Sequence, residues 1–191
     1  TKKANLSGQA NKLTIGFLNP LLRVFASGIT GTASGKVNLS VAQNNIILTG
    51  AVMAENATMK INYLQTKYKM NDSVRFDRKG IKFNNIRIND EKGNQVTLSG
   101  RVNHKNFKDF AADLTINANE CLVLNTKPKD NDLFYGTAYG SGVTTIKSGI
   151  NTLSFDISAK TGKNTKFFMP LNTGLSVSEY SFVSFVDSRL K

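Results

Sequence analysis

Apolar and polar residues alternate along most of this chain, and that period of two constrains the fold more than any other feature. Successive side chains of a β-strand point to opposite faces, so the alternation predicts strands with one apolar and one polar face. The clearest cases, in chain order, are Val37–Val41, Asn45–Thr49, Ile81–Phe83, Ile86–Ile88, Val96–Leu98, Leu114–Ala118 and Leu153–Ile157.

Clusters of Gly, Asn, Asp and Lys separate these runs and supply the positive-φ positions that hairpin turns need. We expect turns at Asp90–Asn94, Gly140–Gly142, Lys147–Gly149 and Thr161–Asn164. The glycine-rich run from Tyr135 to Gly142 lacks the Gly-Lys-Ser/Thr ending of a phosphate loop, so a hairpin turn or tight sheet bend is expected there. The sequence therefore predicts an all-β fold, a long antiparallel meander.

Two stretches depart from this plan. Apolar residues from Leu13 to Phe25 lie near helical intervals, which predicts a short amphipathic helix against one end of the sheet, ended or kinked at Pro20. The tail from Leu175 to Leu190 alternates again and predicts a last strand or edge segment. We expect one β-rich domain, 1–191, with a helical lead-in at 1–27, a curled sheet at 28–174 and a terminal strand at 175–191.

A loose repeat recurs within the strands. Ser34-Gly35-Lys36-Val37-Asn38 resembles Ser99-Gly100-Arg101-Val102-Asn103, and Ser141-Gly142-Val143 is a weaker copy. The copies are unequally spaced, so a solenoid with coils of fixed length is not expected. The repeat is interpreted as one hairpin module used several times.

A sheet with one apolar face must bury that face against another sheet, against itself or against a ligand. The short helix covers only part of it, so either the sheet closes or its concave face stays available, and a large exposed apolar face marks a binding surface. The candidate groove-lining positions are Val37, Leu39, Ile46, Leu48, Val52, Ile61, Phe83, Ile88, Val96, Leu98, Leu114, Ile116, Leu153, Phe155 and Ile157.

Few residues here suit catalysis or metal binding. Cys121 and His104 are the only Cys and His, too few for a structural zinc site, and an isolated thiol in an apolar run is ordinarily a small buried side chain. Because the chain has one residue of each type, a catalytic Cys121/His104 dyad is not excluded by composition. The carboxylate pairs Asp130/Asp132 and Asp72/Asp77 lie among cations and amides in expected loops. We expect a non-enzymatic protein with no catalytic residue, no metal and no cofactor.

The chain is basic, with 25 Lys and Arg against 13 Asp and Glu, a net charge of +12. Seven cations between Lys60 and Lys82 are interleaved with Tyr63, Tyr68 and Phe76, a composition that single-strand nucleic-acid binders share. No helix-turn-helix, RNP-like motif or zinc finger accompanies them, so nucleic acid is not an expected partner. Anionic phospholipid headgroups would be attracted by the same charge.

Several stretches resemble the TamB family of translocation and assembly module proteins, specifically its C-terminal domain. Leu13–Leu22 followed by Gly28–Leu39 is similar to the family's helical lead-in and first strand repeat, and Asn85–Asn94 with Leu98-Ser99-Gly100 resembles its D-x-x-G-N…L-x-G hairpin. Phe134–Gly142 and Gly162–Leu171 look like its last repeats. The resemblance runs from about Leu13 to Asp187, and the chain departs from it at Ser40, where the family repeat often has Gly.

The resemblance implies a periplasmic location, in a longer parent protein anchored in the inner membrane. It implies a sheet curled into an open, taco-like or solenoid-like shape with an apolar concave face, and an Omp85-type outer-membrane barrel as partner through the parent protein. It also implies a role in outer-membrane protein assembly and inter-membrane phospholipid transport, without catalysis. The chain begins without Met, which agrees with a segment of a longer protein.

The expected function is therefore to shield apolar cargo in a hydrophobic groove. The cargo would be phospholipid acyl chains on the concave face or a nascent outer-membrane β-strand added to a sheet edge. The alternative is a structural β-solenoid or adhesin-type domain with a filled core and no cargo. Exposed edge strands would also permit edge-to-edge self-association of the segment.

Overall fold

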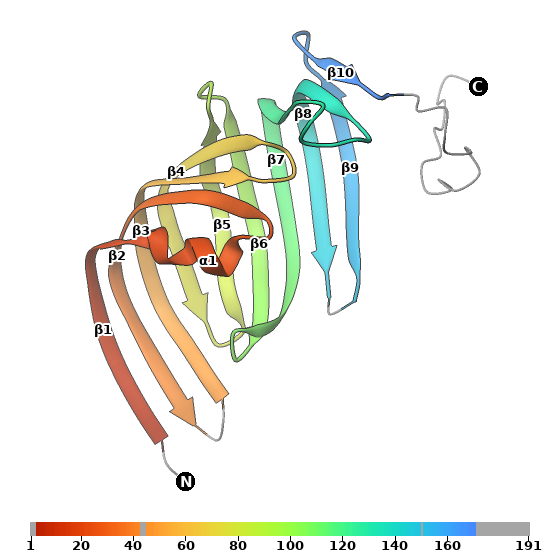
Figure 1. The fold of residues 1–191 in the computed structure, drawn as a ribbon. Coiled ribbons are helices and arrows are strands. Elements are labelled where there is room, and N and C mark those ends of the chain that lie inside the picture. Colours follow the sequence, from red (N-terminus) through yellow and green to blue (C-terminus); the bar gives the residue numbers. More distant parts are fainter. Residues whose placement is uncertain (1–2, 43–44, 150, 171–191) are drawn as a thin grey trace.

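A single antiparallel sheet makes up most of the molecule, and each strand from β1 to β8 pairs with the next along the chain (Figure 1). The computed structural model describes residues 3–42, 45–149 and 151–170. The elements are β1 (Lys3–Thr14), η1 (Ile15–Leu18), α1 (Asn19–Leu22), β2 (Ala26–Ala42), β3 (Asn45–Ile61), β4 (Thr66–Asp77), β5 (Gly80–Asp90), β6 (Gln95–Lys105), β7 (Lys108–Thr126), β8 (Tyr135–Ser148), β9 (Leu153–Thr161) and β10 (Lys166–Phe168).

The predicted open meander is confirmed. Each run of alternating residues lies inside a strand, and β1 does not pair with β9 or β10, so the sheet is not closed into a barrel. β9 and β10 both pair with the outer edge of β8. Between them the chain is tied to β8, because the Gly162 N–H donates to the carbonyl of Tyr139 at 2.8 Å and the Thr165 Oγ1 accepts from the Tyr139 N–H at 3.1 Å.

β-Bulges interrupt β1, β3, β5 and β7. Each contains one non-glycine residue with a left-handed φ between 49° and 50°: Lys12, Asn56, Asn85 and Glu120. A bulge adds one residue to its strand, bends it and increases its twist. In β5 the extra residue also keeps Phe83 and Ile86 on the same face although they are three positions apart.

The serines of the Ser-Gly repeat accept hydrogen bonds from three of these bulges. The Lys12 N–H donates to the Ser34 Oγ at 3.0 Å, the Asn85 N–H to the Ser99 Oγ at 3.2 Å and the Glu120 N–H to the Ser141 Oγ at 2.8 Å. A bulge leaves its extra residue without a ladder partner, and the hydroxyl of the next strand supplies one. The repeat is thus a two-strand unit, which agrees with its interpretation as a hairpin module.

The turn expected at Gly140–Gly142 is wrong, because these residues lie inside β8. Glycine is used there for close approach between strands: a Cβ at Gly142 would collide with the backbone of Ser158 and Ala159 on β9. Gly100 on β6 has a φ of 118° and meets the backbone of Asp113 and Leu114 on β7 in the same way. The other three expected turns lie at strand ends or between strands.

Only part of the expected helical lead-in is helical. Residues Lys3–Thr14 form an edge strand, and helix is confined to η1 and α1, where Pro20 lies in the first turn of α1 and does not end it. The first turn tolerates proline because its N–H has no helical partner. Asn19 fixes this segment beside β2: its side chain accepts from the Ile29 N–H and donates to the Ile29 carbonyl, both at 2.9 Å. The predicted terminal strand at 175–191 lies outside the described residues.

The glycine of the repeat gives a test of the close approach between strands. We expect Gly100→Ala to lower the free energy of unfolding by at least about 2 kcal/mol, because the new Cβ combines backbone strain with a collision against β7. Gly8→Ala on β1 is the control, since its Cβ would come no closer than 4.0 Å to Val37. Urea unfolding followed by circular dichroism measures both, and equal stability of the two variants would contradict this explanation.

Candidate functional site: the inner face of the sheet

The sheet curls back on itself at the end where β5 turns into β6. The Tyr68 hydroxyl of β4 donates to the carbonyl of Leu122 on β7 at 3.0 Å, and the Asn125 N–H of β7 donates to the carbonyl of Leu64 at 2.9 Å. β5 and β6 lie between β4 and β7 in the sheet order, so these bonds require a curl that carries Tyr68 on its concave side. We call the face that bears Tyr68 the inner face and the opposite one the outer face.

The strand register brings all the predicted groove-lining residues to the inner face. Residues paired across antiparallel strands share a face. One row across β5 to β9 runs through Ile86, Leu98, Ile116, Thr144 and Ile157. The same pairing, continued through the bulges, places on this face Val37, Leu39, Ile46, Leu48, Val52, Ile61, Phe83, Ile88, Val96, Leu98, Leu114, Ile116, Leu153, Phe155 and Ile157.

Burial of this face varies across the sheet. Val96, in the middle of the sheet, is 7% exposed, whereas Leu153, Phe155 and Ile157 on β9 are 64%, 56% and 64% exposed. The other eleven predicted positions are half-buried. The inner face is therefore a largely apolar surface that is open at its β9 side and also at β1, where Leu6, opposite Leu39, is 67% exposed. An apolar ligand has the most surface to gain at these edges. That cargo lies on it remains a prediction.

Asp90 is the polar centre of the curled end. It continues the apolar parity of Ile86 and Ile88, so its carboxylate points to the inner face, and it is 5% exposed. The carboxylate accepts hydrogen bonds from the N–H groups of Lys92 and Asn94 at 2.8 and 2.9 Å, from the Asn94 amide at 3.0 Å and from the Leu122 N–H at 2.7 Å. One side chain thus builds the β5–β6 turn and holds β7 against it.

These hydrogen bonds set the charge state of Asp90. Burial by itself would raise the pKa of the carboxyl, but the bonds from Leu122, Asn94 and Lys92 stabilise the ionised form and outweigh it. The pKa of Asp90 therefore lies below its ordinary value. Burial raises the pKa of the neighbouring Tyr68 to about 12, so its hydroxyl remains a donor to Leu122 across the physiological range.

Cys121 and His104 lie at opposite ends of the sheet, so the structure does not bring the possible dyad together. Cys121 is fully buried beside Asp90, and burial first, then the Asp90 charge, raises the pKa of its thiol to about 12. His104 stacks on Phe107, with ring centroids 4.6 Å apart, at the β6–β7 turn. A thiol that stays protonated is a poor nucleophile. Within the described ranges no three His, Cys, Asp or Glu side chains gather as a metal site would require.

Asp72 and Asp77 lie in β4 and not in the expected loop, and both have structural partners. Asp72 accepts from the N–H groups of Ser73 and Arg87 at 2.7 and 3.0 Å, and Asp77 forms a two-pronged ion pair with Arg101. Sequence reasoning placed Asp90 only in a turn and did not identify its contact with Leu122. The sequence did contain a signal for this contact, because Asp90 takes the position that would continue the apolar alternation of Ile86 and Ile88.

Comparison with known families decides the relationship. The family model for the TamB C-terminal domain matches residues 82–191, more than half of the chain. The chain belongs to the TamB family. The match includes the Asp90–Asn94 turn, β7 and the open β9 edge that form this site. Searches of curated proteins and of solved structures returned no significant match.

TamB membership makes the chain part of an envelope protein. The family acts in envelope protein assembly or lipid transport and is known as a non-enzymatic transport and assembly module. No helix within the described ranges is long and apolar enough to cross a membrane. The inner face is the candidate site for that role in this chain.

Asp90 provides the first test of this site. We expect Asp90→Ala to lower the free energy of unfolding by about 3 kcal/mol, because several hydrogen bonds to a charged acceptor are lost and the Leu122 N–H stays buried without a partner. Asp156→Asn, on exposed β9, should leave stability unchanged. Urea unfolding midpoints measure both, and a neutral Asp90→Ala variant would contradict the role given to this carboxylate.

The depressed pKa of Asp90 also predicts a pH dependence. As the pH is lowered, Asp90 takes up a proton in the unfolded chain before it does so in the folded one. Its contribution to the free energy of unfolding is therefore complete above the ordinary Asp pKa of about 3.9 and is lost as the pH falls through the lower folded-state pKa. Wild type should therefore lose stability more steeply than Asp90→Asn below about pH 4. Parallel pH profiles of the two chains would show that this carboxylate does not contribute.

Burial of Cys121 predicts a protected thiol. We expect a thiol reagent to modify it only at the rate of local or global unfolding, and rapidly once urea unfolds the chain. A Leu133→Cys variant, at a position 52% exposed, provides a reactive control. Equal rates at the two thiols in the folded protein would show that the curled end is open.

Proposed function

We propose that the inner face shields the acyl chains of phospholipids as they pass through the envelope. The proposal is supported by one observation above others: fifteen apolar positions, predicted from alternation, share one concave face that is open along β9. Acyl chains need no specific polar contacts, and each methylene removed from water contributes roughly 0.8 kcal/mol. An acyl chain could enter at the exposed side chains of β9 and move toward the half-buried side chains in the middle of the sheet.

The partners and location follow from the family and belong to the same proposal. The parent protein would lie in the periplasm, anchored in the inner membrane, and would work with an Omp85-type outer-membrane barrel. The segment would provide a surface that keeps acyl chains from water between the two membranes. A basic outer face is compatible with anionic headgroups nearby.

A nascent outer-membrane β-strand is the second candidate cargo. The observation that favours it is the free edge: β9 pairs with β8 on one side only, and all its residues are exposed. An added strand would extend the sheet through backbone hydrogen bonds. The same free edges, β1 included, would support edge-to-edge self-association of the segment. A structural domain without cargo would instead keep the inner face covered.

Site-directed photocrosslinking tests these proposals. A photoreactive residue at Leu98 or Phe155, on the inner face, should crosslink to phospholipid in native membranes or in reconstituted vesicles, detected by mass spectrometry. The matched controls are Thr97 and Asp156, the neighbouring positions on the outer face. Crosslinks to lipid from inner positions only support acyl-chain shielding.

The pattern of crosslinks separates the cargoes. A strand added beside β9 would contact both faces of the new pair, so Phe155 and Asp156 would both crosslink to protein. An absence of any lipid or protein crosslink from Leu98 and Phe155 would contradict both proposals and favour the structural alternative.

A further inference from the structure

The outer face bears a row of cations that crosses the sheet. Residues that stand opposite one another on successive strands from β2 to β8 are Lys36, Ala51, Arg75, Lys82, Arg101, Asp113 and Lys147. Five of these seven are basic, and we call those five the basic row. Neighbouring strands lie about 4.8 Å apart, so Arg75, Lys82 and Arg101 on β4, β5 and β6 hold their positive charges in close succession.

This arrangement is electrostatically unfavourable for the protein alone. Like charges directly opposite one another on adjacent strands destabilise a sheet. In the described part of the chain the one ion pair joins Arg101 to Asp77, so the exposed side chains of Arg75 and Lys82 have no carboxylate partner there. An anionic ligand that bridges neighbouring strands would relieve this repulsion.

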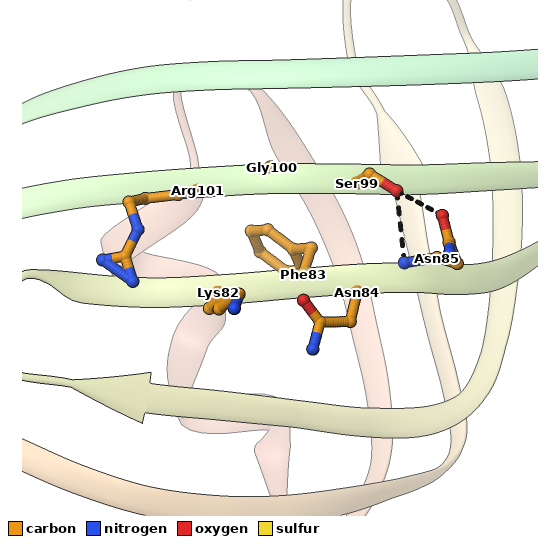
Figure 2. Close-up of a pocket in the computed structure, with 7 residues that line it drawn as sticks. All are labelled: Lys82, Phe83, Asn84, Asn85, Ser99, Gly100 and Arg101. Carbon is orange, nitrogen blue, oxygen red and sulfur yellow. Dashed lines mark hydrogen bonds between the residues drawn. The ribbon is translucent and has the colours of Figure 1, made fainter.

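A shallow depression lies at the centre of the row, and its walls are partly polar and partly apolar. Its volume is about 560 Å³, with Lys82 and Arg101 at one end, Asn84, Asn85 and Ser99 toward the other, and Phe83 and Gly100 between them (Figure 2). Asn85 and Ser99 bind each other, with the Ser99 Oγ donating to the Asn85 Oδ1 at 2.6 Å. Asn84 beside them is exposed, and its amide both donates and accepts. Cations next to an exposed amide suit a ligand with anionic groups and hydroxyls.

Phe83 is the one aromatic residue that lines the depression, and a single ring does not provide the successive stacking platforms of a nucleic-acid binder. Tyr68, Phe76 and Phe83 share the inner face, while the cations Arg75 and Lys82 share the outer one. Basic and aromatic residues that are interleaved in the sequence therefore lie on opposite faces of the sheet. Single-strand binders need aromatic side chains beside their cations for base stacking, and this row has none among its members.

The direction of the row favours a linear ligand. It crosses the strands and so follows the outside of the curl, whereas a flat bilayer touches a convex sheet mainly along a line parallel to the strands. We propose that the outer face binds a linear acidic polysaccharide of the envelope. Its carboxylate or phosphate groups meet Arg75 and Lys82, the neighbouring cations that have no carboxylate partner within the described ranges, and its hydroxyls bond to Asn84. This ligand lies on the opposite face from the acyl cargo, so either proposal can fail alone.

Binding of polygalacturonate, a linear carboxylated polysaccharide, to the full 191-residue chain tests the proposal by calorimetry. We expect salt-sensitive binding that Arg75→Gln/Lys82→Gln weakens by about tenfold, because two charge-assisted contacts are removed. The matched control is Lys60→Gln/Lys67→Gln, a directly opposed pair on the same face with the same charge change. We expect it to retain nearly full affinity. Equal losses in the two variants would overturn the proposal, because they would show diffuse attraction to a basic surface.

Asn84→Ala tests the recognition of sugar. It should weaken polygalacturonate binding more than the binding of inorganic polyphosphate, since polyphosphate has no hydroxyl to donate to the amide oxygen. No effect of Asn84→Ala on either ligand would overturn the saccharide proposal. So would tighter binding, through Arg75 and Lys82, to vesicles of phosphatidylglycerol or to a single-stranded oligonucleotide. Absence of polygalacturonate binding at low salt would overturn it directly.

Discussion

The hydrogen bonds that Asp90 accepts from the backbone of the β5–β6 turn and from the backbone of β7 determine the shape of this sheet. β7 has 19 residues and β6 has 11, so the part of β7 from Cys121 onward extends beyond the β5–β6 turn and has no partner on that side in the sheet. Asp90 binds the Leu122 N–H there, and Tyr68 binds the Leu122 carbonyl from β4. The backbone of one residue, Leu122, is held from two strands, and that requires the sheet to curl.

The curl gives the two faces different chemistry. The inner face gathers the apolar parity of the strands, and the bulges of β1, β3, β5 and β7 preserve that parity across positions where simple alternation would reverse it. The outer face gathers the cations, three of which stand next to one another on β4, β5 and β6. A single sheet can therefore present an apolar surface to cargo and a charged surface to a different partner without a second domain.

Alternation was enough to predict β2, β3, β5, β6, β7 and β9 and the residues of the inner face, because side-chain period depends only on the local backbone. The curl could not be predicted in this way. It depends on contacts between residues far apart in the sequence, such as Tyr68 with Leu122. The glycines at 140–142 were mistaken for a turn because local sequence does not distinguish a turn from close approach of two strands. Lys3–Thr14 was assigned to a helical lead-in, although its partner β2 makes it a strand.

The most direct test of the account is whether acyl chains lie on the inner face. Nuclear magnetic resonance of methyl groups, with a phospholipid spin-labelled on its acyl chain, measures this by paramagnetic broadening. The account predicts strong broadening at Leu98, Ile116 and Ile157 and little at Val143, an outer-face residue of β8 that is 43% exposed. Equal broadening at Val143 and Ile157, or none at any inner methyl group, would contradict it.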